Sequence, residues 1–159
     1  MDNLIKEYRV KAMMHRFFSL YESNNDDFNL VRELLFEDGF VWNSPSGNLV
    51  SIEAFEQSFN ELDKQWRHSH DPGQMTVKII DYKKSQLSFD YVYQNLQGET
   101  MALHAKGHYE IVCIDEGGEL PKIQKCDLTL IEIIKDGKFN DLYEKNHRAY
   151  LDYFEKSRT

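Results

Sequence analysis

The sequence predicts an α+β fold, with helices in its first part and antiparallel strands in its second. Apolar residues recur three and four positions apart between residues 3 and 22, and again from residue 52 onward, as in amphipathic helices. From residue 74 onward apolar and polar residues alternate, as in strands with one buried face. No internal repeat and no linker divides these parts, so we expect residues 1–159 to form a single domain.

The composition is that of an acidic globular protein. The chain has 159 residues, of which 41% are hydrophobic, and this content suits one domain with a core. The formal net charge is −8, and an acidic surface repels phosphate backbones. The only basic doublet, Lys83-Lys84, lies between two strand patterns as a solvated turn. We therefore expect no nucleic-acid partner.

The cysteines and the N-terminal residues bear on the cellular location. Cys113 and Cys126 both fall in apolar strand patterns, which favours buried thiols over a secreted disulfide framework. The N-terminus lacks the basic and then apolar profile of a signal peptide. No segment approaches the roughly 20 apolar residues that span a bilayer. We therefore expect a cytoplasmic protein with no membrane partner.

Three helices are predicted before the strands. The first covers residues 3–22, and the second follows a turn at residues 23–27 and ends before Gly39. Ser51 is the predicted N-cap of the third helix, whose apolar stripe runs to Trp66. The stripes consist of Val10, Met13, Met14, Phe17, Leu20 and Tyr21; of Phe28, Val31, Leu34 and Leu35; and of Ile52, Phe55, Phe59, Leu62 and Trp66.

The strands are separated by recognisable turns. A short strand at residues 40–43 ends in a turn at residues 44–47, and residues 68–71 are expected to form a loop after the third helix. Asp136-Gly137 is the strongest hairpin signal. It predicts a last strand at residues 138–147, followed by a short helix from Ala149.

The strand at residues 123–134 breaks the alternation seen in the others. Cys126, Leu128 and Leu130 lie on one predicted face, whereas Ile131 and Ile133 lie on the other. Apolar residues on both faces indicate that the outer face is covered as well, and a second copy of the chain is the economical cover. We therefore expect a homodimer that pairs through the sheet.

Three sequence blocks stand in an order that matches a known family. They are Phe17-Phe18-Ser19-Leu20-Tyr21 followed by Asn25-Asp26, the run from Leu34 through Trp42 to Gly47, and Asp136-Gly137-Lys138-Phe139. In this order the chain resembles the NTF2-like superfamily, and within it the SnoaL-like and ketosteroid-isomerase-like branch. The resemblance extends to about His147. It implies a cystatin-like cone, in which three N-terminal helices pack on a curved, mainly antiparallel sheet and a pocket lies at the open end.

The catalytic residues of the isomerases are missing at the matching positions. The general base of that branch precedes the proline of the first-strand turn, where this chain has Ser44. The tyrosine of the first helix falls on Phe17, which has no hydroxyl to donate to an oxyanion. The late buried acid falls on Asp127 or Thr129, which share a strand face. The resemblance therefore implies a pocket without the isomerase mechanism.

Candidate catalytic residues remain on the later strands. Asp127 lies between two apolar residues, and inside the cone it would act as an acid or base, whereas outside it would point to solvent or to a partner's lysine. Tyrosine hydroxyls on the apolar strand faces need partners, which are either a ligand or ordinary core groups. The candidate catalytic residues are Asp127, Tyr91, Tyr109 and His147.

Candidate ligand-binding residues come from the apolar stripes and the first turn. The two tryptophans either line the pocket mouth or belong to the core. His104 and His108 are four strand residues apart, about 13 Å, which is too far to share a metal ion, so no metal site is expected. The expected ligand-binding residues are Phe17, Trp42, Ser44, Phe59, Trp66, Tyr93 and Leu103.

Three functional hypotheses follow. The first is a SnoaL-like enzyme, without a cofactor, that isomerises, cyclises, dehydrates or hydrolyses an apolar, polyketide-like or steroid-like substrate. The second is a non-catalytic ligand-binding or protein-interaction domain, and the third is a structural subunit of a larger complex. A cavity that brings an acid and hydroxyl donors within hydrogen-bond reach distinguishes the first hypothesis from the second.

Overall fold

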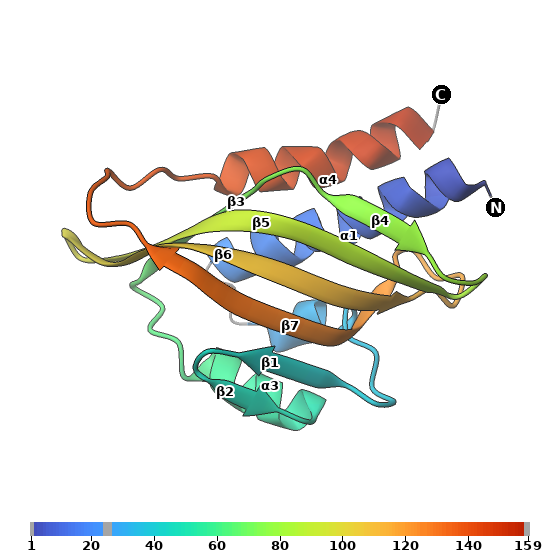
Figure 1. Ribbon diagram of the computed structural model, residues 1–159, viewed down its shortest axis with the longest axis horizontal. Coiled ribbons are helices and arrows are strands. Elements are labelled where there is room, and N and C mark those ends of the chain that lie inside the picture. Colours follow the sequence, from blue (N-terminus) through green and yellow to red (C-terminus); the bar gives the residue numbers. More distant parts are fainter. Residues whose placement is uncertain (1, 24–26, 158–159) are drawn as a thin grey trace.

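The computed structural model describes residues 2–23 and 27–157, in which helices pack against one mainly antiparallel sheet (Figure 1). The predicted α+β class is confirmed, while Asn25-Asp26 of the first sequence block lie outside the described residues. No helix among the described residues is long and apolar enough to cross a membrane. The helices are α1 (Asn3–Glu22), α2 (Phe28–Arg32), α3 (Ile52–Asn60) and α4 (Tyr143–Ser157). The strands are β1 (Val41–Ser44), β2 (Gly47–Leu49), β3 (Arg67–Pro72), β4 (Thr76–Ile79), β5 (Lys84–Gln97), β6 (Thr100–Ile114) and β7 (Lys122–Ile133).

The sheet is built around two long hairpins. Its order is β2-β1-β7-β6-β5-β3, and β4 also pairs with β5. The pairing of β1 with β7 is parallel, whereas the other strand pairs are antiparallel. Figure 1 shows α1 behind the central strands and α3 beside β1 and β2. These helices therefore cover one face of the sheet, called its inner face below.

Helix α1 carries the apolar stripe that its sequence predicts. Its first turn is capped by Asp2, whose side chain accepts a hydrogen bond from the Leu4 N–H at 2.7 Å. Phe18 is completely buried and contacts the rings of Phe89 and Tyr109 on the sheet. Burial of a side chain of this size contributes about 2–3 kcal/mol, so the stripe holds α1 on the sheet.

The third helix is shorter than its apolar stripe predicts, and a strand follows it. Helix α3 ends at Asn60, well before Trp66. Residues 68–71, expected as a loop, belong to β3 and pair with residues 92–95 of β5. The prediction of a loop is wrong because pairing with a long neighbouring strand satisfies the backbone of this polar segment. The alternation of β3 buries His68 and His70 on its inner face.

Strand β7 contains two irregularities that explain its broken alternation. Lys106 of β6 pairs with Glu132, whereas Gly107 pairs with Leu130, so Ile131 is an extra residue in β7. A second register shift leaves Gln124 unpaired in the same way. Each extra residue changes the face on which the next side chains lie. Past the bulge, Ile133 pairs with Ala105 on the inner face, so it shares that face with Leu128 and Leu130. The broken alternation of β7 therefore follows from its bulges and not from apolar residues on both faces.

The end of the chain differs from the prediction. The sequence predicts a hairpin at Asp136-Gly137 and a strand at residues 138–147, and both predictions are wrong. An irregular segment runs to residue 142, and α4 begins at Tyr143. The Gln94 side chain donates a hydrogen bond to the Lys138 carbonyl at 3.0 Å and accepts one from the Asn140 N–H at 2.8 Å. These bonds satisfy the segment without a strand partner.

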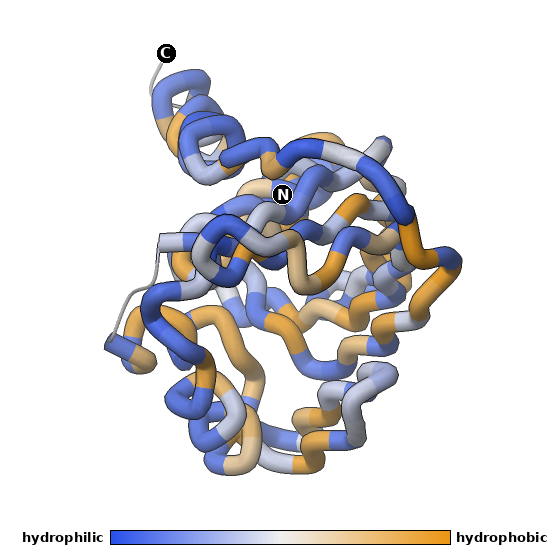
Figure 2. Tube along the Cα trace, turned by 90° about the vertical axis from the view of Figure 1, so that its left-hand side faces the viewer, coloured by the Kyte–Doolittle hydropathy of each residue, from blue (hydrophilic) through white to orange (hydrophobic). Residues whose placement is uncertain are grey.

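Helix α4 lies along α1. Figure 2 shows the helix next to the C label as mostly hydrophilic, with a few hydrophobic residues. Helix α4 nevertheless places one polar side chain, that of Asn146, in a completely buried position. A buried amide needs hydrogen-bond partners, and its partners belong to the candidate site.

Candidate active site

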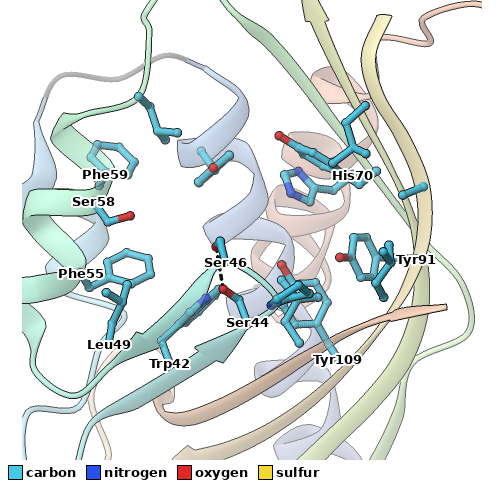
Figure 3. A pocket seen from close by; sticks show the side chains of 18 of the residues that line it. Trp42, Ser44, Ser46, Leu49, Phe55, Ser58, Phe59, His70, Tyr91 and Tyr109 are labelled. Atoms are coloured by element: carbon cyan, nitrogen blue, oxygen red, sulfur yellow. Dashed lines mark hydrogen bonds between the residues drawn. The ribbon is translucent and has the colours of Figure 1, made fainter. Parts of the chain in front are cut away.

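A cavity of about 330 Å³ lies between the inner face of the sheet and helices α1 and α3. Figure 3 shows Phe55 and Phe59 of α3 on one side of it and His70, Tyr91 and Tyr109 on the other. The lining is mostly aromatic and aliphatic, and hydroxyl groups and one imidazole interrupt it. The polar lining residues are Tyr21, Ser44, Ser46, Ser58, His70, Tyr91, Tyr93 and Tyr109.

His70 is the titratable group with the most restricted orientation in the cavity wall. It projects from β3, where its backbone pairs with Tyr93. Its imidazole stacks on the Phe18 ring, with a centroid separation of 4.5 Å and an interplanar angle of 13°. The side chain is 6% exposed. Packing on both the strand and the helix therefore leaves this ring little freedom to rotate.

Glu22, the last residue of α1, lies directly behind His70. Its side chain is 0% exposed. Oε1 accepts a hydrogen bond from the His70 N–H at 2.6 Å and lies 3.3 Å from His70 Nδ1. Because a carboxylate oxygen accepts, Nδ1 is the donor, and Nε2 is left for a ligand. A carboxylate that orients a histidine in this way is the arrangement used to prepare a general base.

Two tyrosine rings lie near His70 on the sheet side. The Tyr91 ring lies 6.2 Å from the His70 ring and 4.6 Å from the Tyr109 ring, measured between centroids. Burial raises the pKa of both tyrosines well above the ordinary value, so their hydroxyls stay protonated and are available as hydrogen-bond donors. Gly107 makes room for Tyr91, since a Cβ at Gly107 would lie 2.6 Å from a Tyr91 ring carbon.

A second histidine of β3, His68, contacts one of the tyrosines that line the cavity. His68 Nδ1 and the Tyr93 hydroxyl are 2.5 Å apart. Burial, and the charge of nearby His70, lower the pKa of His68 to about 4, so its ring is neutral near pH 7. Among the described residues, His68 Nε2 is buried and has no hydrogen-bond partner. No group of three His, Cys, Asp or Glu side chains within the described part of the chain could hold a metal ion.

Serines mark the opening of the cavity. Ser44 ends β1 and Ser46 lies in the turn that follows, with their hydroxyl oxygens 2.9 Å apart (Figure 3). Both residues are at least partly exposed, as is Ser58 on α3 across the opening. The polar mouth and the aromatic interior together favour a ligand that is mainly apolar with a few hydrogen-bonding groups.

Solved structures share this architecture, although no family model matches the chain and no curated protein sequence matches it. A presumed scytalone dehydratase from Novosphingobium aromaticivorans has a TM-score of 0.74 at 11% identity, over 87% of this chain and 93% of the other. An NTF2-like superfamily protein from Salmonella enterica has a TM-score of 0.69 at 10% identity, over 87% and 99%. The chain has the NTF2-like fold.

A third structure agrees with this assignment. An uncharacterized protein with a cystatin-like fold from Caulobacter vibrioides has a TM-score of 0.60 at 8% identity, over 76% of this chain and 86% of the other. The NTF2-like resemblance and the cystatin-like cone predicted from the sequence are therefore confirmed. At these identities the likeness concerns the fold alone, because one fold supports many chemistries.

The NTF2-like cone brings most of the predicted pocket residues to one cavity. Tyr91 and Tyr109, predicted for catalysis, lie in its wall beside His70. Trp66 is not among the described residues that line the cavity, because α3 ends before it. The predicted ligand-binding residues that line the cavity are Phe17, Trp42, Ser44, Phe59, Tyr93 and Leu103.

Two candidate catalytic residues lie outside the cavity. Asp127 is exposed, and its carboxylate accepts a hydrogen bond from Asn43 Nδ2 at 2.8 Å. Its neighbour Leu128 lines the cavity, and strand alternation therefore turns Asp127 to the opposite face. His147 lies in α4, where its ring stacks on Tyr143. Neither residue therefore belongs to the candidate site.

Glu22 and His70 were both missed from the sequence, although two signals point to them. Glu22 stands four residues after Phe18, on the apolar stripe of α1, and a charged residue on such a stripe needs a buried partner. His68 and His70 are two residues apart, which is the period of a strand with one inward face. Neither signal indicates that the two segments meet.

Proposed function

We propose that the chain is an enzyme that transfers protons on a small, uncharged substrate bound in this cavity. The observation that carries the proposal is the His70 imidazole in the cavity wall with the buried Glu22 carboxylate behind it. A histidine that donates through Nδ1 to a carboxylate presents Nε2 as a proton acceptor. The adjacent tyrosine hydroxyls supply the donors that such a reaction needs.

The reaction proposed for this site starts at a carbon next to a substrate carbonyl. His70 Nε2 takes a proton from that carbon, and the carbonyl oxygen becomes an enolate that accepts a hydrogen bond from Tyr91 or Tyr109. Glu22 stabilises the imidazolium that forms. The imidazolium then returns the proton either to a hydroxyl on the next carbon, which leaves as water, or to a different carbon. The first route is a dehydration and the second an isomerisation.

The lining of the cavity supports an apolar, ring-containing substrate of the polyketide-like or steroid-like kind. The Trp42 ring lies 5.4 Å from the Phe17 ring and 4.9 Å from the Phe55 ring, so flat aromatic surfaces form one wall. The described residues that line the cavity include no Asp, Glu, Lys or Arg. A charged substrate would lose its hydration there without gaining an opposite charge.

The proposal is tested with 3-hydroxy-1-tetralone, which loses water to give fluorescent 1-naphthol. His70→Gln is expected to lower kcat/KM by about 10²–10⁴-fold, because the variant has no general base. Glu22→Gln should lower kcat/KM as well, since His70 loses the carboxylate that stabilises its imidazolium. His108→Gln, a histidine on the outer face of the sheet, is the matched control and should retain wild-type turnover.

Two results would contradict this assignment. Turnover that persists in His70→Gln and is lost in Asp127→Asn would move the chemistry to the other face of β7. Tight binding of 1-naphthol in the cavity without turnover of any cyclic β-hydroxy ketone would favour a non-catalytic ligand-binding domain.

We also propose that residues 1–159 act as one domain that pairs with a second copy through the sheet. Ile131 and Ile133 of β7 are 50% and 55% exposed, which supports an apolar contact at this end of the sheet. Sedimentation equilibrium is expected to give twice the chain mass of 18.9 kDa, and Ile131→Lys should give the mass of one chain. A wild-type protein that sediments as a single chain would refute the pairing.

A further inference from the structure

Asn146 connects helix α4 to the proposed catalytic pair. Its side chain is 0% exposed. The amide nitrogen lies 3.1 Å from Glu22 Oε1, 3.2 Å from Glu22 Oε2 and 3.0 Å from the His70 carbonyl oxygen. One amide group thus holds both the carboxylate and the backbone of the histidine that this carboxylate orients.

The surroundings of Asn146 fix the orientation of its amide. The atoms around the nitrogen are carboxylate and carbonyl oxygens, all of them acceptors. If the amide were turned over, its oxygen would face these acceptors without any proton between them. The nitrogen therefore points to Glu22 and the amide oxygen points away.

The amide oxygen determines the protonation of a second histidine. His15 Nδ1 lies 2.9 Å from Asn146 Oδ1. An amide oxygen only accepts hydrogen bonds, so His15 Nδ1 carries a proton. Burial lowers the pKa of His15, which keeps the ring neutral with its proton on Nδ1. A chain of hydrogen bonds thus runs from His15 through Asn146 and Glu22 to His70.

We propose that Asn146 is a positioning residue, which holds the Glu22 carboxylate against His70 Nδ1 and so keeps Nε2 as the nitrogen that faces the substrate. The inference rests on the proposed function, because it names the residue that prepares the proposed base. Through Asn146, helix α4 would orient the proposed catalytic pair, although this helix contributes no residue to the cavity lining within the described part of the chain. The alternative to this positioning role is a purely structural one, in which Asn146 only fastens α4 to α1.

Asn146→Leu separates the two roles. Leucine has nearly the same shape but has no N–H to donate to Glu22 and no acceptor for His15. The readout is the ring ¹⁵N NMR spectrum of histidine-labelled protein, which reports the tautomer of each histidine. The His70 signals are assigned by their absence in His70→Gln.

In the wild type we expect His70 to carry its proton on Nδ1. In Asn146→Leu we expect a mixture of both tautomers, because no amide holds the Glu22 carboxylate against His70 Nδ1. Turnover of 3-hydroxy-1-tetralone should fall by about ten- to a hundredfold, as expected when a catalytic group is misplaced. Arg148→Gln changes an exposed residue of the same helix and should leave tautomer and turnover unchanged.

His15→Phe provides a second variant if Asn146→Leu fails to fold. It leaves the amide oxygen without a donor, so the hold on Glu22 loosens and the His70 tautomers should again mix. A wild-type tautomer in folded Asn146→Leu, or in His15→Phe when only that variant folds, would overturn the positioning role. The NMR readout needs no turnover, so a failure of the proposed reaction in His70→Gln is recognised separately.

Discussion

Replacing Glu22 with alanine is expected to lower the free energy of unfolding by about 3–5 kcal/mol. The carboxylate is completely buried and accepts hydrogen bonds from the His70 N–H and the Asn146 amide. In the variant the His70 N–H stays buried without its acceptor, and the Asn146 amide keeps only the His70 and Leu142 carbonyls, so the hydration lost on folding is not fully compensated. The effect is large because α1, β3 and α4 all meet at this one group.

Equilibrium urea unfolding followed by circular dichroism measures the effect. Glu22→Gln retains an acceptor oxygen but turns an amide toward the Asn146 amide, so a smaller loss of about 1–3 kcal/mol is expected. Glu99→Ala, in the exposed turn between β5 and β6, is the matched control and should stay within about 0.5 kcal/mol of the wild type. A Glu22→Ala variant as stable as this control would show that the buried carboxylate contributes nothing to the fold.

Stability is expected to fall by about 2 kcal/mol between pH 7 and pH 5 because of His68. In the folded state burial, and the charge of His70, lower the pKa of His68 to about 4, whereas the unfolded chain has the ordinary value of 6.5. Below pH 6.5 the unfolded chain therefore binds a proton that the folded chain does not accept. The free energy of unfolding therefore decreases as the pH falls from 6.5 toward 4, and His68 causes no such decrease above pH 6.5.

The pH dependence is measured by urea unfolding at half-unit steps from pH 5 to pH 7. His68→Gln keeps a donor for the Tyr93 hydroxyl but cannot titrate, so it should flatten the slope. A residual slope of the same sign is expected from His15, whose pKa burial also lowers. An unchanged slope in His68→Gln would mean that His68 is solvated in the folded protein.

His108 serves as the control because its effect has the opposite sign. Hydrogen bonds that the His108 ring donates to the Glu110 and Asp90 carboxylates raise the pKa of His108 in the folded state. Its contribution is therefore complete below pH 6.5 and is lost only as the pH rises through the raised value. His108→Gln should leave the slope between pH 5 and pH 6.5 unchanged.

Local patterns predicted the parts of the site that lie on regular elements. The alternation of β5 and β6 placed Tyr91, Tyr93 and Tyr109 on one face, and all three line the cavity. The helical stripe placed Phe17 and Phe59 inward in the same way. These predictions work because a strand repeats every two residues and a helix every 3.6, so a buried face is visible in the sequence.

Other residues depend on contacts between distant segments. Asp127 has apolar neighbours on both sides, but the phase of β7 is set by its bulges and its pairing with β6, and this phase turns the side chain outward. Strand β3 has almost no apolar residue of its own and forms because β5 provides a partner. A local pattern has no means of showing either effect.

The sequence by itself determined the α+β class, the long strands and the apolar stripes of α1 and α3. Only the tertiary structure decided the candidate catalytic pair, because Glu22 and His70 are 48 residues apart and meet where the end of α1 crosses β3. Asn146 joins them from a position 124 residues after Glu22. The physical reason is that a buried charge is tolerated only where donors converge on it, and packing of the whole chain brings those donors together.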